Sequence, residues 1–158
     1  MKLLKTIRLD ISDQNTFPSA AEAGEWAVTG TFAFTDLDAA HMDNKEQLAF
    51  RNGWLGLSSF GRASLVQVSS VSDTEHENIT HALAAHLHRD YGAPDMMAAL
   101  EAARMEISDT EGISNHPPGT LLSIERELSE EGVVERIRAI SRSDDHARIW
   151  EIEEDETD

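Results

Sequence analysis

The sequence predicts an α+β fold, with an antiparallel or mixed sheet of five or six strands and about three helices packed chiefly on one face. Apolar and polar residues alternate over residues 3–11 and 26–34, and a two-residue period is typical of half-buried strands. Apolar residues take helical spacing over 73–91 and after Pro94, and two more alternating runs lie within 121–140. Because strands and helices do not alternate strictly, this order argues against a doubly wound parallel sheet.

The first two strands are predicted from alternation alone. Ile7, Leu9 and Ile11 share one face of the segment 3–11. In the segment 26–34 the bulky residues also share a face, and Gly30 among them indicates a bulge or a close packing approach. These bulky residues are Trp26, Val28, Phe32 and Phe34.

A helix and a third strand are expected in the next part of the chain. The helix begins near Asp43 or Asn44, and its end is poorly defined because glycines follow it closely. The run from Leu65 to Val71 has apolar residues on both parities, which predicts a largely buried strand.

Two helices should follow. Ser72 and Glu75 have the spacing of a capping box, so a helix is expected over about 73–91. Gly92 is expected to end it in a left-handed conformation, and Pro94 fits the first turn of the next helix. Gly112 should close that helix. Its buried face is expected to contain Met96, Leu100, Ala103 and Ile107.

Residues 121–128 and 133–140 are predicted to form a hairpin around the four-residue loop Ser129-Glu130-Glu131-Gly132. The preferred register brings apolar residues together and sets opposite charges across from each other. Its pairs are Leu128 with Val133, Arg126 with Glu135, Ile124 with Ile137, and Leu122 with Ala139.

The domain organisation is predicted to be one domain, residues 1–143, followed by an acidic C-terminal tail, residues 144–158. The 158-residue length fits a single domain. Within the tail, residues 149–152 contain Trp150 between two isoleucines, so this segment is expected to dock in cis, where it could add a strand, or to bind a partner. The other tail residues have too little apolar surface to offset the entropy of ordering them.

The composition excludes several classes of chemistry. The absence of cysteine rules out disulfides, thiolate metal sites and a thiol nucleophile in this chain. No stretch approaches the roughly 20 apolar residues that span a bilayer, and the first residues lack the apolar core of a signal peptide. We therefore expect a soluble, cytoplasmic protein.

The formal net charge of −17 bears on binding partners. Such a field repels phosphate backbones and anionic lipid surfaces, so we expect neither nucleic-acid nor membrane binding. A protein partner with a basic surface is plausible, and a homo-oligomer is possible. Acidity that serves only solubility is the alternative explanation.

The histidines of the segment 73–91 do not have metal-site spacing. His76, His81, His86 and His88 are separated by five, five and two residues, whereas ligands on one helix need three or four. We therefore expect no metal and no cofactor. His86 lies near apolar positions on the helical wheel, where packing is the simpler role and a ligand contact the alternative.

Three other strings have a structural and a functional interpretation. The segment 56–61, Gly-Leu-Ser-Ser-Phe-Gly, matches neither a hydrolase elbow nor a phosphate loop, and a flexible connector is expected. Asp36 and Asp38 could bind a hard metal, but aspartates before a helix commonly cap it. His116 before Pro117-Pro118-Gly119 could be presented at a site, or the prolines could simply orient the next strand.

Three strings of residues resemble a known family. They are Lys-Leu-Leu-Lys-Thr-Ile-Arg-Leu-Asp at 2–10, Gly-Glu-Trp-Ala-Val at 24–28 and Asn-His-Pro-Pro-Gly-Thr-Leu at 115–121. With them the chain resembles, over nearly its whole length, an uncharacterised proteobacterial protein family, a domain of unknown function without assigned activity or catalytic residues. The resemblance implies an accessory role connected with maturation of a metalloenzyme, formate dehydrogenase.

The function expected from the sequence is a non-catalytic interaction or accessory protein, because no convergent catalytic motif is found. The alternative is a small enzyme or a small-molecule-binding protein with a pocket near Trp26, Phe34, His86 and His116. These four residues, together with Trp150, are the predicted binding or partner surface.

Overall fold

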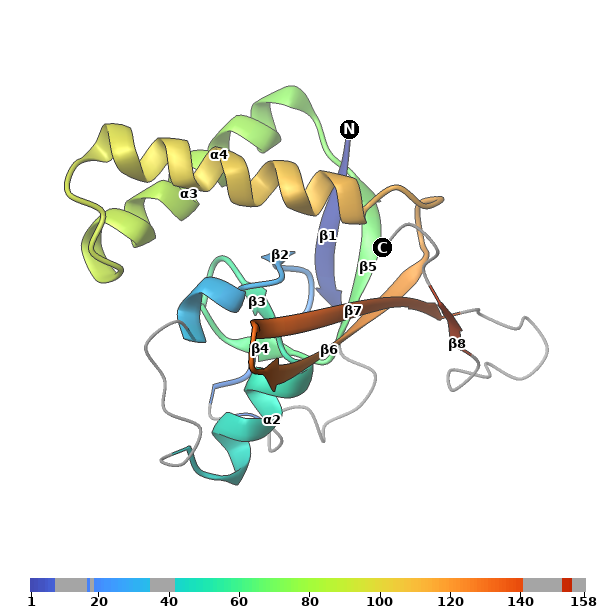
Figure 1. Ribbon diagram of the computed structural model, residues 1–158. Helices are drawn as coiled ribbons and strands as arrows, with labels where there is room; N and C mark the ends of the chain where they lie inside the picture. The colour runs from blue at the N-terminus through green and yellow to red at the C-terminus, as the bar shows by residue number, and fades with distance from the viewer. Residues whose placement is uncertain (8–16, 18, 35–41, 141–151, 155–158) are drawn as a thin grey trace.

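The computed structural model describes residues 1–7, 17, 19–34, 42–140 and 152–154. These residues form three α-helices, a short 3₁₀ helix and one sheet with the strand order β4-β3-β2-β1-β5-β6-β7-β8 (Figure 1). Every pair of neighbouring strands is antiparallel. The α+β class is therefore confirmed, and the antiparallel alternative holds for these strands. The predicted number of five or six strands is too low.

The two strands that the sequence did not predict are short, β3 (Trp54–Gly56) and β4 (Arg62–Ala63). The strand anticipated at the C-terminal tail is present as β8 (Ile152–Glu154) at the far edge. A strand of two or three residues shows less than two periods of the pattern from which a strand is predicted.

The second predicted strand is shorter than expected. β1 is Lys2–Ile7, and residues 8–11 of the predicted first strand lie outside the described residues. β2 covers only Trp26–Val28, because Gly30 has a positive φ of 75° and the chain then forms a 3₁₀ helix, Thr31–Phe34. Gly30 thus follows the strand instead of forming a bulge within it, and the alternative of close packing is confirmed, because an added Cβ would overlap the Cβ of Leu55.

The segment 56–61 connects β3 to β4, as expected of a connector, and hydrogen bonds to Glu25 hold its turn. The buried carboxylate of Glu25 accepts hydrogen bonds from the backbone N–H groups of Ser58 (3.0 Å) and Ser59 (2.8 Å) and from the Ser59 hydroxyl (2.7 Å). A carboxylate with several N–H and O–H donors makes strong, charge-assisted bonds that hold a turn in one conformation.

The predicted helix starts are confirmed. α2 (Asn44–Asn52) begins after Asp43 and α3 (Asp73–Asp90) after Ser72, and each has a complete capping box. Gly92 has a φ of 79°, as expected for a residue that follows a helix.

The buried face of α4 (Met96–Ile113) differs from the predicted one. Met96 is 44% exposed and Leu100 half-buried, whereas Ala103 and Ile107 are buried as expected. Asp95 caps this helix, so Pro94 precedes the cap, and Gly112 lies inside the last turn. The face is rotated because α3 packs along α4, and small residues at the contact let two helices approach closely. The buried residues of α4 are Ala99, Ala103, Ile107 and Thr110.

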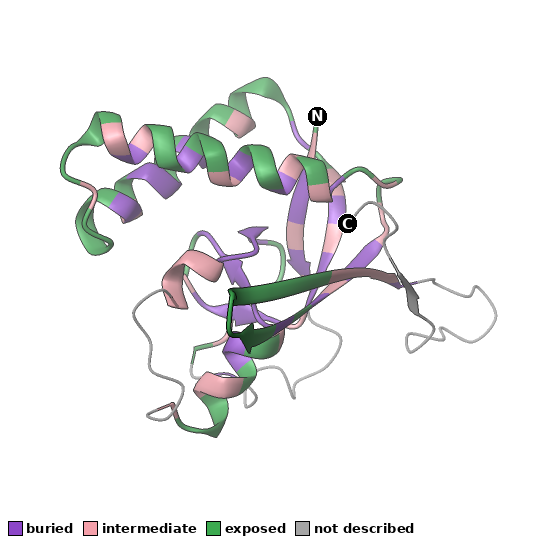
Figure 2. Ribbon diagram, viewed as in Figure 1, coloured by how far each residue is buried: buried purple, intermediate pink, exposed green. Residues whose placement is uncertain are grey.

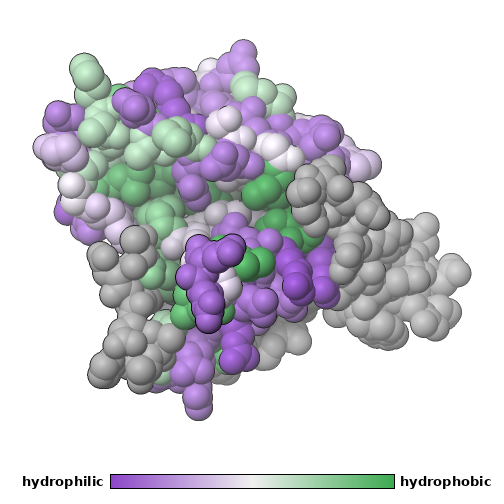
Figure 3. Space-filling model, in the orientation of Figure 1, coloured by the Kyte–Doolittle hydropathy of each residue, from purple (hydrophilic) through white to green (hydrophobic). Residues whose placement is uncertain are grey.

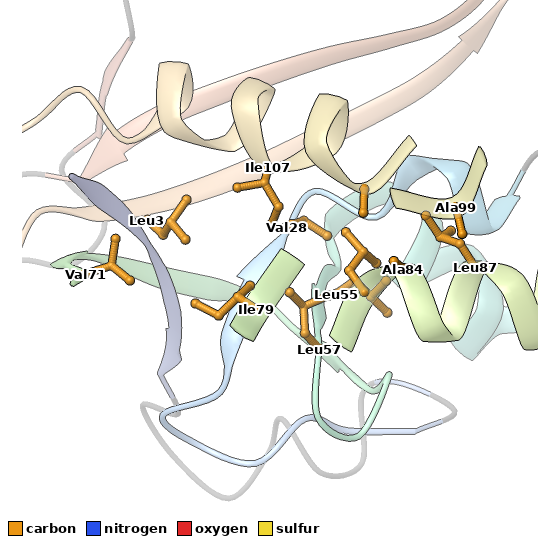
Figure 4. Close-up of a cluster of buried hydrophobic side chains, with 12 residues drawn as sticks. Leu3, Val28, Leu55, Leu57, Val71, Ile79, Ala84, Leu87, Ala99 and Ile107 are labelled. Atoms are coloured by element: carbon orange, nitrogen blue, oxygen red, sulfur yellow. The ribbon is translucent and has the colours of Figure 1, made fainter. Parts of the chain in front are cut away.

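α3 and α4 cover one face of the sheet and lie at the top of Figure 1. α2 contacts β6 and lies at the bottom of the same view. Side chains from both helices interlock with those of the strands in one apolar cluster (Figure 4). The labelled members are Leu3, Val28, Leu55, Leu57, Val71, Ile79, Ala84, Leu87, Ala99 and Ile107.

The other face of the sheet curls over a second apolar cluster. Leu4 of β1, Val66 and Val68 of β5 (Leu65–Ser70) and Trp54 of β3 meet there and are at most 1% exposed. Ile124 of β6 joins them at 1% exposure. The sheet can bury both faces because the helices cover one and its own curvature encloses the other.

The predicted hairpin register is confirmed. In β6 (Leu121–Ser129) and β7 (Gly132–Ile140), Ile124 pairs with Ile137 and Arg126 with Glu135. The turn contains two residues instead of four, because Ser129 already pairs with Gly132.

The hairpin tip is exposed, although its residues continue the apolar pattern (Figure 2). Leu128 and Val133 pair as predicted, but Leu128 is 56% exposed and Val133 40%. The reason is that β5 pairs with β6 only as far as Ser123, so the tip extends beyond the sheet. Residues 149–151 lie outside the described residues, so docking of Trp150 remains a prediction.

Replacing Gly30 with alanine should destabilise the fold far more than the same change at Gly24. Both glycines have positive φ, where a side chain costs about 1–2 kcal/mol. At Gly30 the new methyl group would also overlap Leu55 and approach the Arg62 guanidinium to 2.8 Å, and such overpacking adds about 1–3 kcal/mol. At Gly24 nothing lies within 4 Å. Urea unfolding of the two variants measures the difference, and equal losses would contradict the packing described for Gly30.

Candidate functional site

A groove of about 840 Å³ separates the C-terminal half of α4 from β7. In the space-filling view, apolar side chains line parts of the band between the helix pair and the hairpin (Figure 3). The walls come from α4, from β7 and from the segment that joins β2 to the 3₁₀ helix. The lining residues are Thr29, Thr31, Glu106, Ser108, Asp109, Gly112, Ile113, Val133, Glu135 and Ile137.

Three carboxylates line this groove: Glu106, Asp109 and Glu135. Burial raises the pKa of Glu106 above its usual range, while hydrogen bonds from the Gly30 N–H and the Thr29 hydroxyl (3.3 Å) oppose that rise. Nearby Asp109 and Glu135 raise it further. Among the described residues, no lysine, arginine or histidine forms an ion pair with Glu106 or Asp109. The groove therefore has a negative wall on its α4 side, with the buried Arg126 close enough for the charge of Glu106 to raise the Arg126 pKa.

Glu135 is held differently, by the buried side chain of Arg126. The Arg126 Nε lies 3.4 Å from the Glu135 carboxylate and 2.8 Å from the Thr31 hydroxyl, which also donates to Glu135. The Arg126 side chain is fully buried, while Glu135 remains 31% exposed at the groove. One end of this ion pair thus reaches the core and the other reaches the groove.

The rest of the Arg126 guanidinium binds backbone carbonyl groups. Nη1 donates to the carbonyls of Phe50 (2.7 Å) and Gly53 (3.0 Å) at the end of α2, and Nη2 donates to that of Thr29. Carbonyls at a helix C-terminus lack intrahelical partners and carry partial negative charge. A guanidinium with its fixed fork of donors can therefore satisfy several of them at once.

Arg62 of β4 occupies the same polar cluster. It donates to the carbonyls of Gly53 (3.1 Å) and Gly30 (3.1 Å). Burial lowers the pKa of Arg62 to about 9, with a further contribution from the nearby charge of Arg126. Burial also lowers the pKa of Arg126, while Glu135 and, more weakly, Glu106 raise it. We call Arg62, Arg126 and the carbonyls that they bind the arginine cluster.

Of the predicted surface residues, Phe34 lies at the arginine cluster. Its ring centroid is 4.3 Å from the Arg62 guanidinium carbon and 5.5 Å from that of Arg126. The ring also meets Phe50 edge to face at 5.3 Å. Phe34 therefore covers the buried cations instead of lining the groove.

The other predicted residues lie in separate surroundings. His86 stacks on Phe60 with ring centroids 4.0 Å apart, and Trp26 packs beside the first apolar cluster with the Lys5 ammonium 4.5 Å from its ring. The carbonyl of His116 accepts a hydrogen bond from Lys2 (2.8 Å). None of these residues, nor Phe34, lines the groove. Trp150 lies outside the described residues.

Three histidines of α3 contact carboxylates instead of one another, one of them being His86, which lies 3.6 Å from Asp90. His76 lies 2.8 Å from Glu111 of α4, and His81 lies 3.2 Å from Glu77. Across the described ranges, histidine and acidic side chains form no cluster of three that could hold a metal ion. In that same part of the chain, no helix has the length and apolar character that crossing a bilayer requires.

Sequence inspection missed Glu106 and the burial of Arg126. One signal was present for Arg126, because it has the same strand parity as the core residues Leu122 and Ile124. Glu106 gave no such signal, since it precedes Ile107 on a helix whose charged positions are mostly exposed.

The chain belongs to a family described as a family of unknown function (DUF6505), which matches residues 1–157. This confirms the expected membership of a domain of unknown function that covers nearly the whole chain. No curated protein and no solved structure matches the sequence.

Replacing Arg126 with methionine should destabilise the protein by about 3–5 kcal/mol, because buried carbonyls and Glu135 lose their charged donor. Arg136→Met on the neighbouring strand is the matched control, since that side chain is 56% exposed and should change stability by less than about 0.5 kcal/mol. Chemical denaturation measures both. Similar stability of the two variants would show that the arginine cluster contributes little.

Glu106→Gln should stabilise the protein at neutral pH and have no effect at acid pH. Because the folded-state pKa of Glu106 is raised, the unfolded chain loses this proton first, and stability falls as pH rises from the ordinary glutamate pKa to the folded one. Because glutamine does not ionise, the variant does not lose this stability as the pH rises. Urea unfolding at a series of pH values tests the sign, and a variant that is less stable than the parent at neutral pH would contradict it.

Proposed function

We propose that this protein is a non-catalytic interaction protein that binds a basic segment of a partner protein in the groove between α4 and β7. The observation that carries the proposal is the pair Glu106 and Asp109, which line the groove and form no direct ion pair with a cation among the described residues. Glu106 is partly buried and Asp109 is exposed, so the ionised form of Glu106 in particular is stabilised when a cation pairs with it. A lysine or arginine of a partner could pair with both carboxylates.

The charge of the whole chain supports the same partner chemistry. A net charge of −17 attracts a basic surface from a distance and speeds its encounter with the groove. The groove then offers both carboxylates and apolar atoms, from Val133, Ile137 and Ile113, to a side chain with an apolar stem and a cationic head.

The proposed cellular role is that of an accessory protein of proteobacterial origin in the maturation of a metalloenzyme such as formate dehydrogenase. Support comes from the resemblance of residues 2–10, 24–28 and 115–121 and from the binding groove. Co-purification of formate dehydrogenase subunits with the tagged chain from its native host tests this role. Retention of those subunits by the parent and their loss on combining Glu106→Gln with Asp109→Asn is the expected result, while unchanged enzyme maturation in a strain lacking the gene would contradict it.

Binding of a basic segment should depend on Glu106 and Asp109. A lysine-containing peptide, followed by fluorescence anisotropy, should bind about ten-fold more weakly to the double variant Glu106→Gln, Asp109→Asn, because two screened charge contacts are lost. The control is Glu127→Gln with Glu130→Gln, which makes the same change in net charge on exposed hairpin residues outside the groove. Equal weakening in both variants would mean that only the overall charge matters.

The same binding should strengthen as pH rises. Because burial keeps the pKa of Glu106 raised, ionisation of this carboxylate completes the negative wall only above that pKa. Glu106→Gln should reduce the pH dependence. If a small polyamine such as spermidine binds with the same dependence while no peptide does, the groove holds a small cation instead of a protein segment.

A further inference from the structure

The outer edge of β7 is open beside the groove. β8 pairs with β7 only at Arg138, Ala139 and Ile140. From Gly132 to Ile137, the structure describes no strand on the side of β7 that faces away from β6. An unpaired strand edge presents N–H and C=O groups in the pattern that another extended chain can bind.

The alternation of hydrogen-bonded and non-hydrogen-bonded pairs in the hairpin identifies the β7 residues whose backbone N–H and C=O groups point away from β6. Ser129 and Gly132 flank a two-residue turn and so form a hydrogen-bonded pair, after which such pairs alternate along the ladder. Val133, Glu135 and Ile137 consequently belong to the other class, whose N–H and C=O groups point away from β6. The pattern in β6 agrees with this assignment. Ile124 of β6 lies opposite Ile137, and its carbonyl points away from β7 and accepts a hydrogen bond from the Asn52 amide (3.1 Å).

The same three residues line the groove with their side chains. A chain lying along this edge would therefore bond to the backbone of Val133, Glu135 and Ile137 and place alternate side chains over the groove. Residues Gly132–Arg136 are exposed, so the described part of the structure leaves room for such a chain.

We propose that the partner segment adds to the sheet as an extended strand, antiparallel to β7 along Gly132–Ile137. This inference rests on the proposed function and specifies how the groove binds. Antiparallel addition continues the pairing found throughout the sheet and is slightly more stable per residue than parallel pairing. Main-chain bonds would supply affinity, and alternate side chains would supply specificity.

The groove selects the side chains of this segment. Residues opposite Val133 and Ile137 should be apolar, and the residue between them, opposite Glu135, should be lysine or arginine, near Glu106 and Asp109. Two other occupants have the wrong charge. The chain's own residues 144–158 contain eight acids and one arginine, a net charge of −7, and a second copy of the chain carries −17.

A synthetic peptide with the order valine, lysine, valine at alternate positions, separated by threonines, tests the inference. In antiparallel addition the lysine N–H points to β7 and the threonine N–H points away. N-methylation at the lysine should therefore weaken binding to the full chain at least about three- to ten-fold, while N-methylation at a threonine should change it less than two-fold. Amide exchange at Val133, Glu135 and Ile137 should slow when the peptide binds.

A matched pair of protein variants gives an independent readout. Val133→Pro removes one outward N–H without removing a bond to β6, and proline is tolerated at strand edges. It should weaken peptide binding, whereas Val133→Thr should not. Circular dichroism and unfolding would establish that both variants fold, and if Val133→Pro does not, the N-methylated peptides still decide the question.

The outcomes separate this inference from the proposed function. Equal binding of both methylated peptides, with continued dependence on Glu106 and Asp109, would overturn strand addition and leave groove binding intact. Absence of peptide binding would overturn both. Slow exchange at Val133 in the free chain, lost on truncation after Ser143 or on dilution, would show that the tail or a second copy covers the edge, and this too would overturn the inference.

Discussion

The arrangement of this fold depends on the arginine cluster. Arg62 comes from the edge of the sheet and Arg126 from the hairpin, and both donate to the Gly53 carbonyl after α2. Together they also bind the carbonyls of Thr29 and Gly30. Two guanidinium groups are costly to bury, and their lowered pKa values express that cost. It is offset only because several orphaned carbonyls need donors at one place.

This constraint sets the position of the hairpin tip. Beyond Ser123 the sheet no longer supports β6, so the tip is anchored by Arg126 and by the contact between α2 and β6. Gly30 matters for the same reason, since its left-handed backbone brings a carbonyl to Arg62 at a place where a methyl group would not fit. The groove is the space left between the anchored hairpin and α4.

The groove combines features that natural proteins seldom leave uncovered. An exposed strand edge is usually protected by charge or by another element, and a partly buried carboxylate is more stable with a cation beside it. Here Glu106 accepts hydrogen bonds but forms no direct ion pair among the described residues, and β7 lines the same groove. Both features are explained together if a basic, extended chain binds there, and neither requires a catalytic role for the histidines of α3.

The sequence by itself determined the local elements. The capping boxes at Asp43 and Ser72 and the pairing of Ile124 with Ile137 are set by residues close in sequence, so pattern and spacing were sufficient. Only the tertiary structure decided which side chains of the hairpin tip are buried, because the pairing of β5 with β6 ends before Arg126. It also decided which carboxylates meet across the groove. Glu106 and Glu135 are brought together by the packing of α4 and β7, and such long-range contacts leave no periodic trace in a single sequence.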